Sequence, residues 1–515
     1  MGFISIFNDV LGPVMRGPSS SHTAGSHHIG LMVRSLLEED PIAVDITFDP
    51  DGSYARVFRE QGVDLALACG LLEIPLIDDR FFQALKIAKD MGCKIDFSIS
   101  KLKRADHPNF VRINITGKSQ QKLSIEARSI GGGMVQITRL NGYNVQLSGK
   151  AVEYVFVCHI ECETLITRIK QMDGLMDIPD ISELKNEKII VARFENQIPV
   201  EEEIKINSME VIKKQWKSSP VFNIKKGNEL FFNAREMIRM ADTHSRSLGE
   251  IALLYEADLL GISEEEVIGE MLRRYNVMRE SVNRGLNNKN ARMQLLEPSA
   301  HEIAEKENKG GLAVGGLHTR AAARAMAAMH TSNSMGIVCA APTGGSAGTI
   351  PGVITSLTEE KKMNPEQIAR ALFAASAIGL IVARRATFAA EIAGCQVEIG
   401  AAGAMAAAAV VECTGGHARQ SCDSAAIAFQ NTMGSVCDLV QGICEIPCHT
   451  RNALAASSAF VCADLILGGY INPIPLDETI DAVFSVGRML PSELRCTALG
   501  GLAMTPSGQK IPRRN

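Results

Sequence analysis

The sequence predicts an α+β protein with three successive parts: an N-terminal α/β domain over residues 1–151, a small βαβ-type domain over residues 152–224, and an all-helical domain over residues 225–515. Two observations predict this division. Segments in which polar and apolar residues alternate are confined to the first half of the chain, and this period indicates strands. After about residue 231 apolar residues recur at helical spacing and helix caps appear.

The N-terminal domain combines strands with a polar loop ahead of a helix. A helix is expected over residues 57–72, which have helical periodicity. The loop, Gly17–Gly30, reads GPSSSHTAGSHHIG and is rich in hydroxyls, glycines and histidines. Amides and hydroxyls at a helix N-terminus bind carboxylates and phosphates, although Ser and Thr also serve there as ordinary caps. The expected strands are residues 42–48, 94–99, 110–115 and 123–128.

The small middle domain is expected to follow the order β-α-β-α-β, which resembles an ACT regulatory domain. Where such domains have a Pro-Gly turn, this chain has His159, Ile160, Glu161 and Cys162. Strand alternation puts Cys158 and its neighbour His159 on opposite faces, so we expect packing here rather than a metal site. The expected elements are a strand at 154–158, a helix at 164–172, a strand at 188–194, a helix at 208–216 and a strand at 220–224.

The C-terminal domain carries clear helix start and stop signals. Ser263 with Glu266 forms a capping box. Asn364, followed by Pro365 and then Gln367, has the residues of an N-cap, an N1 proline and an N3 partner. Two glycines at 415–416 close an alanine-rich helix.

Bulk composition gives no reason to expect nucleic acid or a membrane as a partner. The net charge is −5 and only 5% of residues are aromatic. The longest apolar runs, residues 371–383 and 399–411, are too short to span a bilayer. The N-terminal sequence MGFISIFNDV lacks the basic region of a signal peptide. Thirteen cysteines in such a chain indicate a reducing cytoplasm rather than a disulfide framework.

The stretch from Cys395 to Cys448 is the most informative part of the chain. It is poor in charge and rich in Ala and Gly, and Cys437 lies within it. Thiolates in a dry environment suit a soft metal or an iron–sulfur cluster. Free cysteine is also among the most buried residue types. Spacing alone favours that second interpretation, because no CxxC pair is present.

Flanking residues point to a family. The relevant stretches are GCQVEIG around Cys395, CD at Cys437, IPC ending at Cys448, and the tripeptide Arg-Asn-Ala that begins at Arg451. These flanking residues resemble those of the α part of the iron–sulfur L-serine dehydratases. The resemblance implies that these three cysteines hold a [4Fe-4S] cluster with one open iron. It also implies that Arg451 and Asn452 bind substrate.

Further motifs of the same family occur elsewhere in the chain. GPSSSHT resembles the N-terminal signature of the β part, and SIGGGMV at Ser129–Val135 resembles its SVGGG motif. SNSMG and APTGGSAGTIPG resemble α-part segments, and the second implies a backbone-amide cradle for the substrate carboxylate. The implied substrate-binding residues are Ser19, Ser20, Ser21, Thr23, Thr343, Gly344 and Gly345.

One motif departs from the family pattern. The family has a GHGTD-like motif whose histidine is a candidate base, and this chain has Gln61 in place of that histidine. An amide cannot act as a base at neutral pH. We therefore expect His22 or Glu60 to serve as the catalytic base, or the chemistry to be altered.

The resemblance implies an L-serine ammonia-lyase that forms pyruvate and ammonia by β-elimination, in amino-acid degradation and gluconeogenesis. A base removes the Cα proton, and the open iron eases departure of the β-hydroxyl. A cytoplasmic homodimer that acts on a small-molecule amino acid is expected. Alternatives are a related lyase for L-cysteine or L-threonine, a catalytically silent amino-acid-binding paralogue, and an electron carrier, for which Cys444 is the candidate fourth ligand. The last cysteine, Cys496, precedes the tail TPSGQKIPRRN, so we expect no tail thiolate at the iron.

Overall fold

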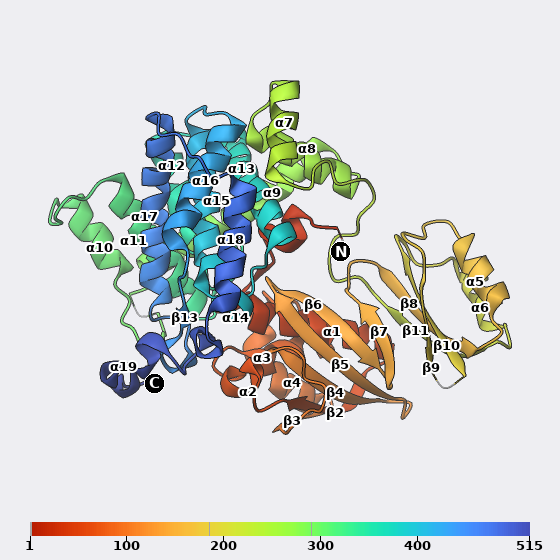
Figure 1. Ribbon diagram of the computed structural model, residues 1–515. Coiled ribbons are helices and arrows are strands. Elements are labelled where there is room, and N and C mark those ends of the chain that lie inside the picture. The colour runs from red at the N-terminus through yellow and green to blue at the C-terminus, as the bar shows by residue number, and fades with distance from the viewer. Residues whose placement is uncertain (1–2, 185, 290, 515) are drawn as a thin grey trace. The chain divides into compact units, whose positions relative to one another are not determined.

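The computed structural model describes residues 3–184, 186–289 and 291–514, and its backbone forms two compact units (Figure 1). The fold is α+β, as predicted, with an α/β region in the first half and helices in the second. The structure divides into two compact units, and the first residues of the chain belong to the unit of C-terminal helices. The division into three domains stays a prediction. The helical unit comprises Met1–Ala24, Gly131–Gly133 and Gly227–Asn515, and the sheet unit comprises Gly25–Ile130 and Met134–Lys226.

In the described part of the sheet unit, the larger sheet has the strand order β3-β2-β4-β5-β6-β7. β2 pairs in parallel with β3 and antiparallel with β4, and β4 pairs antiparallel with β5. The four predicted strands are confirmed as β2 to β5, and two further strands, β6 and β7, were not predicted. The bounds are β2 Pro41–Phe48, β3 Lys94–Ile99, β4 Phe110–Gly117, β5 Lys122–Gly131, β6 Met134–Leu140 and β7 Tyr143–Leu147.

Helices α1 and α3 pack on this sheet and cross each other at two glycines. A Cβ on Gly70 would lie 2.8 Å from the Cα of Gly30, so side chains at this crossing would force the helices apart. The single helix predicted over residues 57–72 is wrong, because Gly62 adopts a left-handed conformation (φ 63°) and separates two helices. The bounds are α1 Gly25–Leu37, α2 Ser53–Val57, α3 Val63–Leu71, η3 Asp79–Gln83 and α4 Ala84–Asp90.

The smaller antiparallel sheet has the order β11-β8-β10-β9 within the described residues. Its central strand β8 is buried on both faces: Val155 and Val157 join the core of the larger sheet, and Tyr154 and Phe156 join a second core with α5 and α6. The bounds are β8 Val152–His159, α5 Glu163–Lys170, β9 Asp180–Leu184, β10 Glu187–Phe194, α6 Val200–Asn207 and β11 Ile212–Ser218.

The predicted order of elements in this small region needs correction. The first two strands and the first helix are confirmed as β8, β10 and α5. The helix expected at 208–216 is wrong, because α6 ends at Asn207 and β11 follows as the partner of β8. Three glutamates in the first turn of α6 suit the positive end of its dipole and mark its true start. Residues 220–224 form no strand, and β9 was not predicted.

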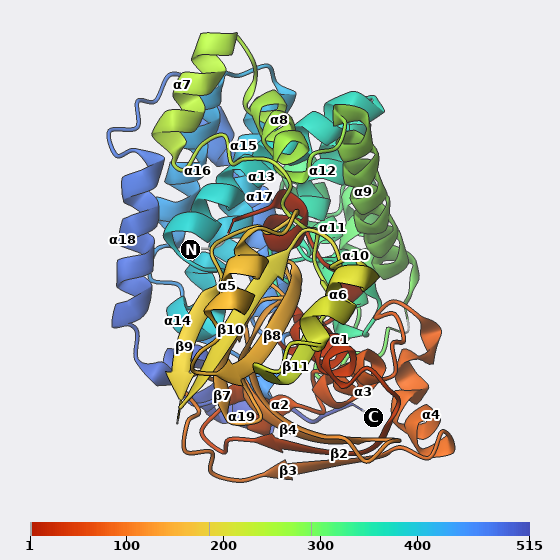
Figure 2. The same cartoon turned by 90° about the vertical axis from the view of Figure 1, so that its right-hand side faces the viewer.

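Helix α15, Ile399–Cys413, is central to the core of the helical unit (Figures 1 and 2). Its first thirteen residues are all buried, and it packs against α12, α13, α16 and α17. Small side chains allow this close packing. The other bounds are α7 Ala234–His244, α8 Leu248–Leu260, α9 Glu264–Asn287, α10 Ala300–Asn308, α11 Leu317–Asn333, α12 Thr349–Glu360, α13 Pro365–Arg385, α14 Ala390–Ala393, α16 Ala418–Thr432, α17 Cys448–Leu467, α18 Leu476–Met489 and α19 Pro506–Lys510.

The predicted helix boundaries in this unit are confirmed. Ser263 and Asn364 each form a capping box, at α9 and α13. Gly415, with φ 78°, lies just after α15. Two helical segments, Pro365–Arg385 and Cys395–Cys413, are long and apolar enough to cross a membrane, but 78% and 89% of their apolar windows are buried in the structure. Packing within the protein thus accounts for their composition.

The N-terminal segment is anchored within the helical unit. Glu256 of α8 accepts hydrogen bonds from a hydroxyl and backbone N–H groups at the start of the turn η1 (Ile6–Val10). The Arg274 side chain of α9 donates to carbonyl groups of the same segment. Strand β1 (Val14–Arg16) then pairs antiparallel with β12 (Ile337–Cys339). These contacts fix the course of the chain into the serine-rich loop.

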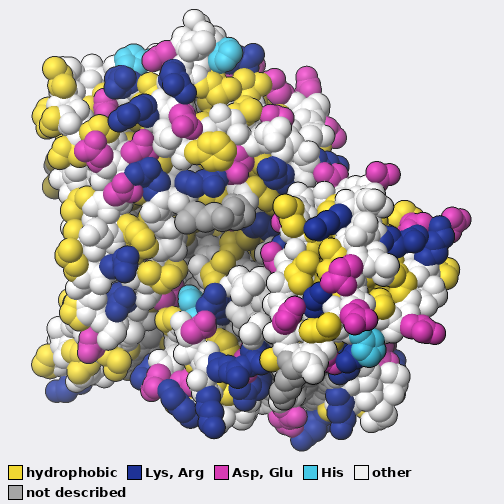
Figure 3. All heavy atoms as spheres, turned by 45° about the vertical axis from the view of Figure 1, so that its right-hand side comes forward, with side chains coloured by type: hydrophobic (Ala, Val, Ile, Leu, Met, Phe, Trp, Pro, Cys, Tyr) yellow, Lys and Arg dark blue, Asp and Glu magenta, His cyan; other side chains and the backbone are white. Residues whose placement is uncertain are grey.

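Charges of both signs are present on the face of the molecule shown in Figure 3. On the face shown in Figure 3, Lys and Arg side chains alternate with Asp and Glu. This pattern agrees with the small net charge of −5.

Candidate active site

Among the described residues, five cysteines gather in one buried group of the helical unit. They come from four separate stretches of the chain, since Cys444 and Cys448 are only four residues apart, and all described cysteines have free thiols. Chain reversals bring the segments together: Gly394, before the first cysteine, has φ 75°. The five are Cys395 in the turn η4 (Cys395–Val397), Cys437 in β13 (Cys437–Asp438), Cys444, Cys448 at the start of α17, and Cys496 in β14 (Arg495–Thr497).

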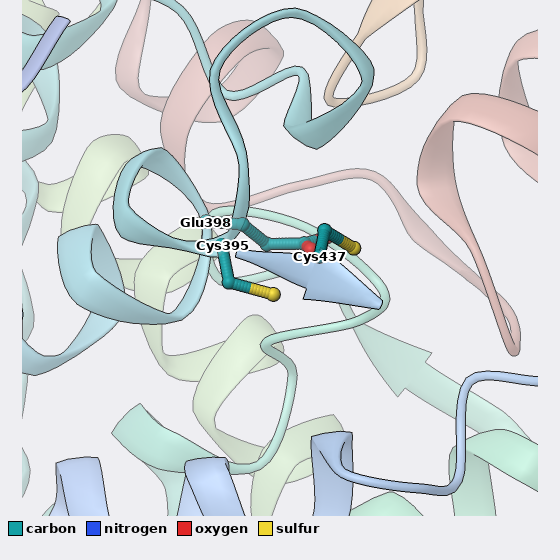
Figure 4. Close-up of side chains that lie close together, drawn as sticks. All are labelled: Cys395, Glu398 and Cys437. Carbon is teal, nitrogen blue, oxygen red and sulfur yellow. The ribbon is translucent and has the colours of Figure 1, made fainter. Parts of the chain in front are cut away.

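The thiols lie within metal-binding distance of one another. The Sγ atoms of Cys395 and Cys437 and a carboxylate oxygen of Glu398 all lie within 4.8 Å (Figure 4). The Sγ atoms of Cys444 and Cys448 are 3.5 Å apart. Charge at Cys395 also contributes to the raised pKa of Cys448, which indicates that the two pairs face the same space.

The thiols fit a metal that takes sulfur ligands. A hydrogen bond with Cys437, followed by burial, raises the pKa of Cys395 well above its usual value, and the Cys444 contact and burial do the same for Cys448. Such thiols stay protonated until a metal displaces the protons. Several buried thiols that form no disulfide match the donor set of an iron–sulfur cluster. The assignment of Cys395, Cys437 and Cys448 as its three ligands stays a prediction.

Cys496 lies within this group, contrary to expectation. Strand β14 pairs in parallel with β13, and the Cys496 thiol hydrogen-bonds with that of Cys437. The tail is held there because the Leu502 N–H donates to the Asp438 carboxylate at 2.8 Å. The expectation of a tail without a thiolate near the site is therefore wrong.

Arg451 contacts the cysteines rather than open space. Its guanidinium lies 3.6 Å from the Cys395 sulfur and donates to the Val436 carbonyl at 2.7 Å. It also forms an ion pair with buried Asp438 at 3.0 Å. The hydrogen bond with Cys437 and burial raise the pKa of the Cys395 thiol, and the positive charge of Arg451 offsets part of this rise, which favours the thiolate. Substrate binding by Arg451 stays a prediction.

Asn452 joins the glycine-rich loop to the first turn of α17. The amide oxygen accepts hydrogen bonds from the N–H and hydroxyl of Thr349, at 3.1 and 2.9 Å. The amide nitrogen donates to the carbonyls of Gly345 and Cys448, both at 2.9 Å. Because Asn452 is fully buried and its amide is used in these bonds, the structure gives it a positioning role. Direct substrate contact by Asn452 stays a prediction.

The glycine-rich loop and the serine-rich loop lie against each other. A Cβ on Gly344 would lie 2.8 Å from the backbone nitrogen of Ser20, and a Cβ on Gly345 would lie 3.3 Å from the Cys444 sulfur. The Thr343 hydroxyl donates to Glu398. The glycines therefore allow two polar loops to approach the cysteines closely.

The serine-rich loop supplies a network of hydroxyls around one histidine. The Nδ1 atom of His22 is 3.1 Å from the hydroxyl oxygens of both Ser19 and Ser21. Ser21 donates to Glu391 of α14 at 2.7 Å, and His22 lies 3.8 Å from the same carboxylate oxygen. Ser21 and His22 belong to the turn η2 (Ser20–Ala24), whose five residues, including Thr23, are all buried.

The glycines of the SIGGG motif and the stretch that contains Glu60 and Gln61 belong to different units of the structure. Gly131 of the SIGGG motif belongs to the helical unit, and a Cβ there would lie 2.9 Å from the Cβ of Ala389. Glu60 and Gln61 belong to the sheet unit, between α2 and α3. The role of Glu60 as a base stays a prediction.

Sequence reasoning missed two acidic residues. Glu398 is part of the GCQVEIG motif, and Glu391 precedes it in α14. Burial raises the pKa of Glu398 to about 7, and the charge of Glu391 adds to the effect. The GCQVEIG motif could have identified Glu398 as a site residue. No sequence pattern could have identified Glu391, because its partner Ser21 is far away in the sequence.

A cavity of about 590 Å³ adjoins the cysteines. Cys395 and Arg451 line it, and most of its walls are side chains of α16 and α17. Because exposed side chains of α17, such as Leu454, also line the cavity, it is an open pocket of the helical unit that reaches Cys395.

Comparison with known proteins identifies the family of the chain and several relatives. The family model described as "Serine dehydratase alpha chain" matches residues 190–503. The probable L-serine dehydratase alpha chain of Bacillus subtilis is 36% identical over 285 residues, which are 55% of this chain and 95% of the relative. The L-serine dehydratase alpha chain of Peptoniphilus asaccharolyticus is 35% identical over 281 residues, which are 54% of this chain and 96% of that protein.

The chain is also similar to a protein of a different type. The probable L-serine dehydratase beta chain of Bacillus subtilis is 40% identical over 149 residues, which are 29% of this chain and 66% of the relative. One polypeptide therefore contains parts similar to the alpha and beta chains.

Proposed function

Because the chain belongs to the serine dehydratase alpha-chain family and also carries a beta-chain-like part, we propose that it is an L-serine dehydratase. It deaminates L-serine to pyruvate and ammonia by β-elimination. The observation that carries this proposal is the gathering of Cys395, Cys437 and Cys448 in one buried group next to the serine-rich loop. The names of the relatives support the substrate.

Three thiolates would hold a [4Fe-4S] cluster, those of Cys395, Cys437 and Cys448. When bound, such a cluster supplies a Lewis acid for oxygen atoms of the substrate. Arg451 favours the thiolate form of Cys395 by its positive charge. Asn452 fixes the first turn of α17, which carries Cys448, to the loop at Gly345.

The two polar loops would bind the substrate. Backbone N–H groups at Thr343–Gly345 and hydroxyls at Ser19–Thr23 are the donors expected to hold its carboxylate. Asn452 and close glycine packing support a fixed loop geometry. A fixed geometry reduces the entropy lost when the substrate is oriented for reaction.

β-Elimination requires a base for the Cα proton. His22 is the candidate in the helical unit, because its Nδ1 contacts two hydroxyls and lies near Glu391. Removal of the Cα proton and cleavage of the Cβ–O bond release water and leave aminoacrylate. Its imine tautomer then hydrolyses to pyruvate and ammonia. Glu60 is the alternative base.

One observation favours a second candidate function. Gln61 replaces the histidine of the family motif, which supports a related lyase acting on L-cysteine or L-threonine. Purification without oxygen, iron and sulfide analysis, and pyruvate and 2-oxobutyrate assays with L-serine, L-cysteine and L-threonine test both candidates. We expect L-serine to give the highest kcat/KM. Turnover of none of the three by protein with bound cluster would contradict the proposal and favour the silent amino-acid-binding paralogue.

The wider organisation is also a proposal. We propose three domains, with residues 152–224 as an ACT-like regulatory domain, and a cytoplasmic homodimer. The ferredoxin-like sheet order β11-β8-β10-β9 supports the ACT-like domain. Exposed apolar side chains on α17, namely Leu454, Val461 and Leu465, support self-association.

A further inference from the structure

Glu398 lies in the candidate active site, and neither the cluster nor the base accounts for it. It stands between η4 and α15, with φ −110° and ψ −80°, outside the helical conformation. Its side chain extends from this break toward Cys437 (Figure 4). A carboxylate oxygen lies within 4.8 Å of the sulfurs of Cys395 and Cys437.

The surrounding loop holds this carboxylate in place. The Thr343 hydroxyl donates to Oε1 of Glu398, and the same hydroxyl lies 3.0 Å from that of Ser346. A Cβ on Gly345 would lie 2.7 Å from Oε1, so this glycine leaves the space that the carboxylate occupies. The position of the carboxylate is therefore set by the loop before any ligand binds.

An ionised carboxylate at this position has no cationic partner among the described residues of the protein. Among the described residues, Glu398 has one hydrogen bond, from Thr343, and no ion pair with Lys, Arg or His. Arg451, which contacts the cysteine group, is paired with Asp438 and Cys395. A buried carboxylate without a cation is costly, and thiolate ligands would add further negative charge. A bound cation would offset this cost.

We propose that Glu398 binds the α-ammonium group of the amino-acid substrate, and that it selects amino acids over the corresponding hydroxy acids. This inference rests on the proposed function. The ammonium group supplies the missing cation and three N–H donors, and charge-assisted hydrogen bonds to a fixed carboxylate are strong. The substrate carboxylate then lies toward the amides of the glycine-rich loop, so that the two ends of the zwitterion meet different partners.

The test compares two ligands that differ only in this group. L-Alanine and L-lactate have the same carbon skeleton and carboxylate, and neither has a β leaving group. Their affinities are measured by calorimetry on cluster-loaded wild-type protein and on Glu398→Gln, with iron and sulfide determined for each sample. Glutamine keeps the size of the side chain and an acceptor for Thr343 but removes the charge.

We expect Glu398→Gln to weaken L-alanine binding at least about tenfold, because truncating a buried charge pair removes much of its coupling. L-Lactate affinity should change less than about threefold or rise, and iron content should stay unchanged. The matched control is Glu412→Gln, which lies at the other end of the same helix and accepts from the Gly249 N–H. The control should alter neither affinity.

Three results would overturn the inference. Equal weakening of both ligands would show a general disturbance of the site, and unchanged L-alanine affinity would show that the ammonium group binds elsewhere. Loss of iron from Glu398→Gln would show that the carboxylate is a metal ligand instead. Wild-type protein with bound cluster that neither forms pyruvate from L-serine nor binds L-alanine would overturn the proposed function as well, which separates the two failures.

Discussion

Two regions of the chain bury neighbouring cysteines, and their surroundings differ. Cys158 lies in β8 of the smaller sheet and Cys162 lies just before α5, and their thiols are hydrogen-bonded to each other and packed in an apolar core with Tyr154. Cys395 and Cys437 are equally buried but lie near Arg451 and acidic side chains. Burial raises the pKa of Cys158 to about 12, and the pKa of Cys395 is also raised, by its hydrogen bond with Cys437 and by burial. Burial and a raised thiol pKa therefore do not identify a site.

The backbone and the polar neighbours distinguish the two regions. Cys158 lies within the regular strand β8, whereas Cys395, Cys437 and Cys448 stand at the starts of short elements or helices. Cys496 itself has φ 59°, a conformation uncommon for residues with a side chain. Chain reversals, charges and hydroxyls at the cysteine group indicate a binding site, and regular packing around Cys158 indicates a core.

The largest expected effect contrasts single serine substitutions in the two regions. Cys395→Ser should lower pyruvate formation by at least about 10³-fold and lower bound iron, because a metal ligand is lost. Cys158→Ser should leave activity within about threefold of wild type, since a buried hydroxyl disturbs only local packing. Activity assays and iron analysis on anaerobically purified proteins check both. Full activity of Cys395→Ser would show that Cys395, like Cys158, is a packing residue and not a metal ligand.

The second expected effect tests whether the loop around the cysteines is held by Asn452. Asn452→Ala should lower the free energy of unfolding by about 2–3 kcal/mol, because buried donors and acceptors lose their partner. Urea unfolding measures this. Asn283→Ala is the control, because the Asn283 side chain is exposed on α9; it should cost less than about 0.5 kcal/mol. An equal loss of unfolding free energy in both variants would show that the hydrogen bonds of Asn452 do not stabilise the loop.

Much of the fold could be predicted because local signals were strong. The capping residues Ser263 and Asn364 define helix starts on their own, and alternation defines β2 to β5. Prediction from local sequence patterns failed where tertiary contacts determine the secondary structure. Residues 212–218 become β11 because they pair with β8, and Gly62 breaks a helix that periodicity alone would continue.

The candidate site could be predicted in part for the same reason. Motifs identified the serine-rich loop and the glycine-rich loop, which the structure places together. The sequence could not show that Cys496 returns to Cys437, because a parallel pair of short strands makes that contact across a long separation. Nor could it show the bond from Ser21 to Glu391, since neither residue has a local pattern that marks it.

A third effect concerns the tail thiol. Cys496→Ala should lower the KM for L-serine severalfold, because a thiol beside Cys437 that can compete for an open metal position is removed. The same variant should lose iron faster in air. Steady-state kinetics and timed iron analysis measure these changes. An unchanged KM with unchanged iron loss would show that Cys496, like Cys158, is only a packing residue.

The smallest effect concerns pH. His330 of α11 is fully buried, and burial lowers its pKa from 6.5 to about 4. The unfolded chain therefore binds an extra proton between these values, so that stability falls as pH decreases from about 6.5 toward 4. His330→Leu should flatten this dependence in urea unfolding followed by far-UV circular dichroism. Trp216, the single tryptophan, reports on the sheet unit, whose unfolding should not respond to the substitution. A slope unchanged in His330→Leu would contradict the prediction.

The most direct measurement is pyruvate formation from L-serine as a function of bound iron and sulfide. Protein purified without oxygen is stripped of metal and then reconstituted stepwise, with iron, acid-labile sulfide and activity determined at each step. We predict that activity rises in proportion to bound iron and sulfide in the wild type and stays near zero in Cys395→Ser, Cys437→Ser and Cys448→Ser. Full activity in protein free of iron and sulfide, or normal cluster binding in these variants, would contradict the account.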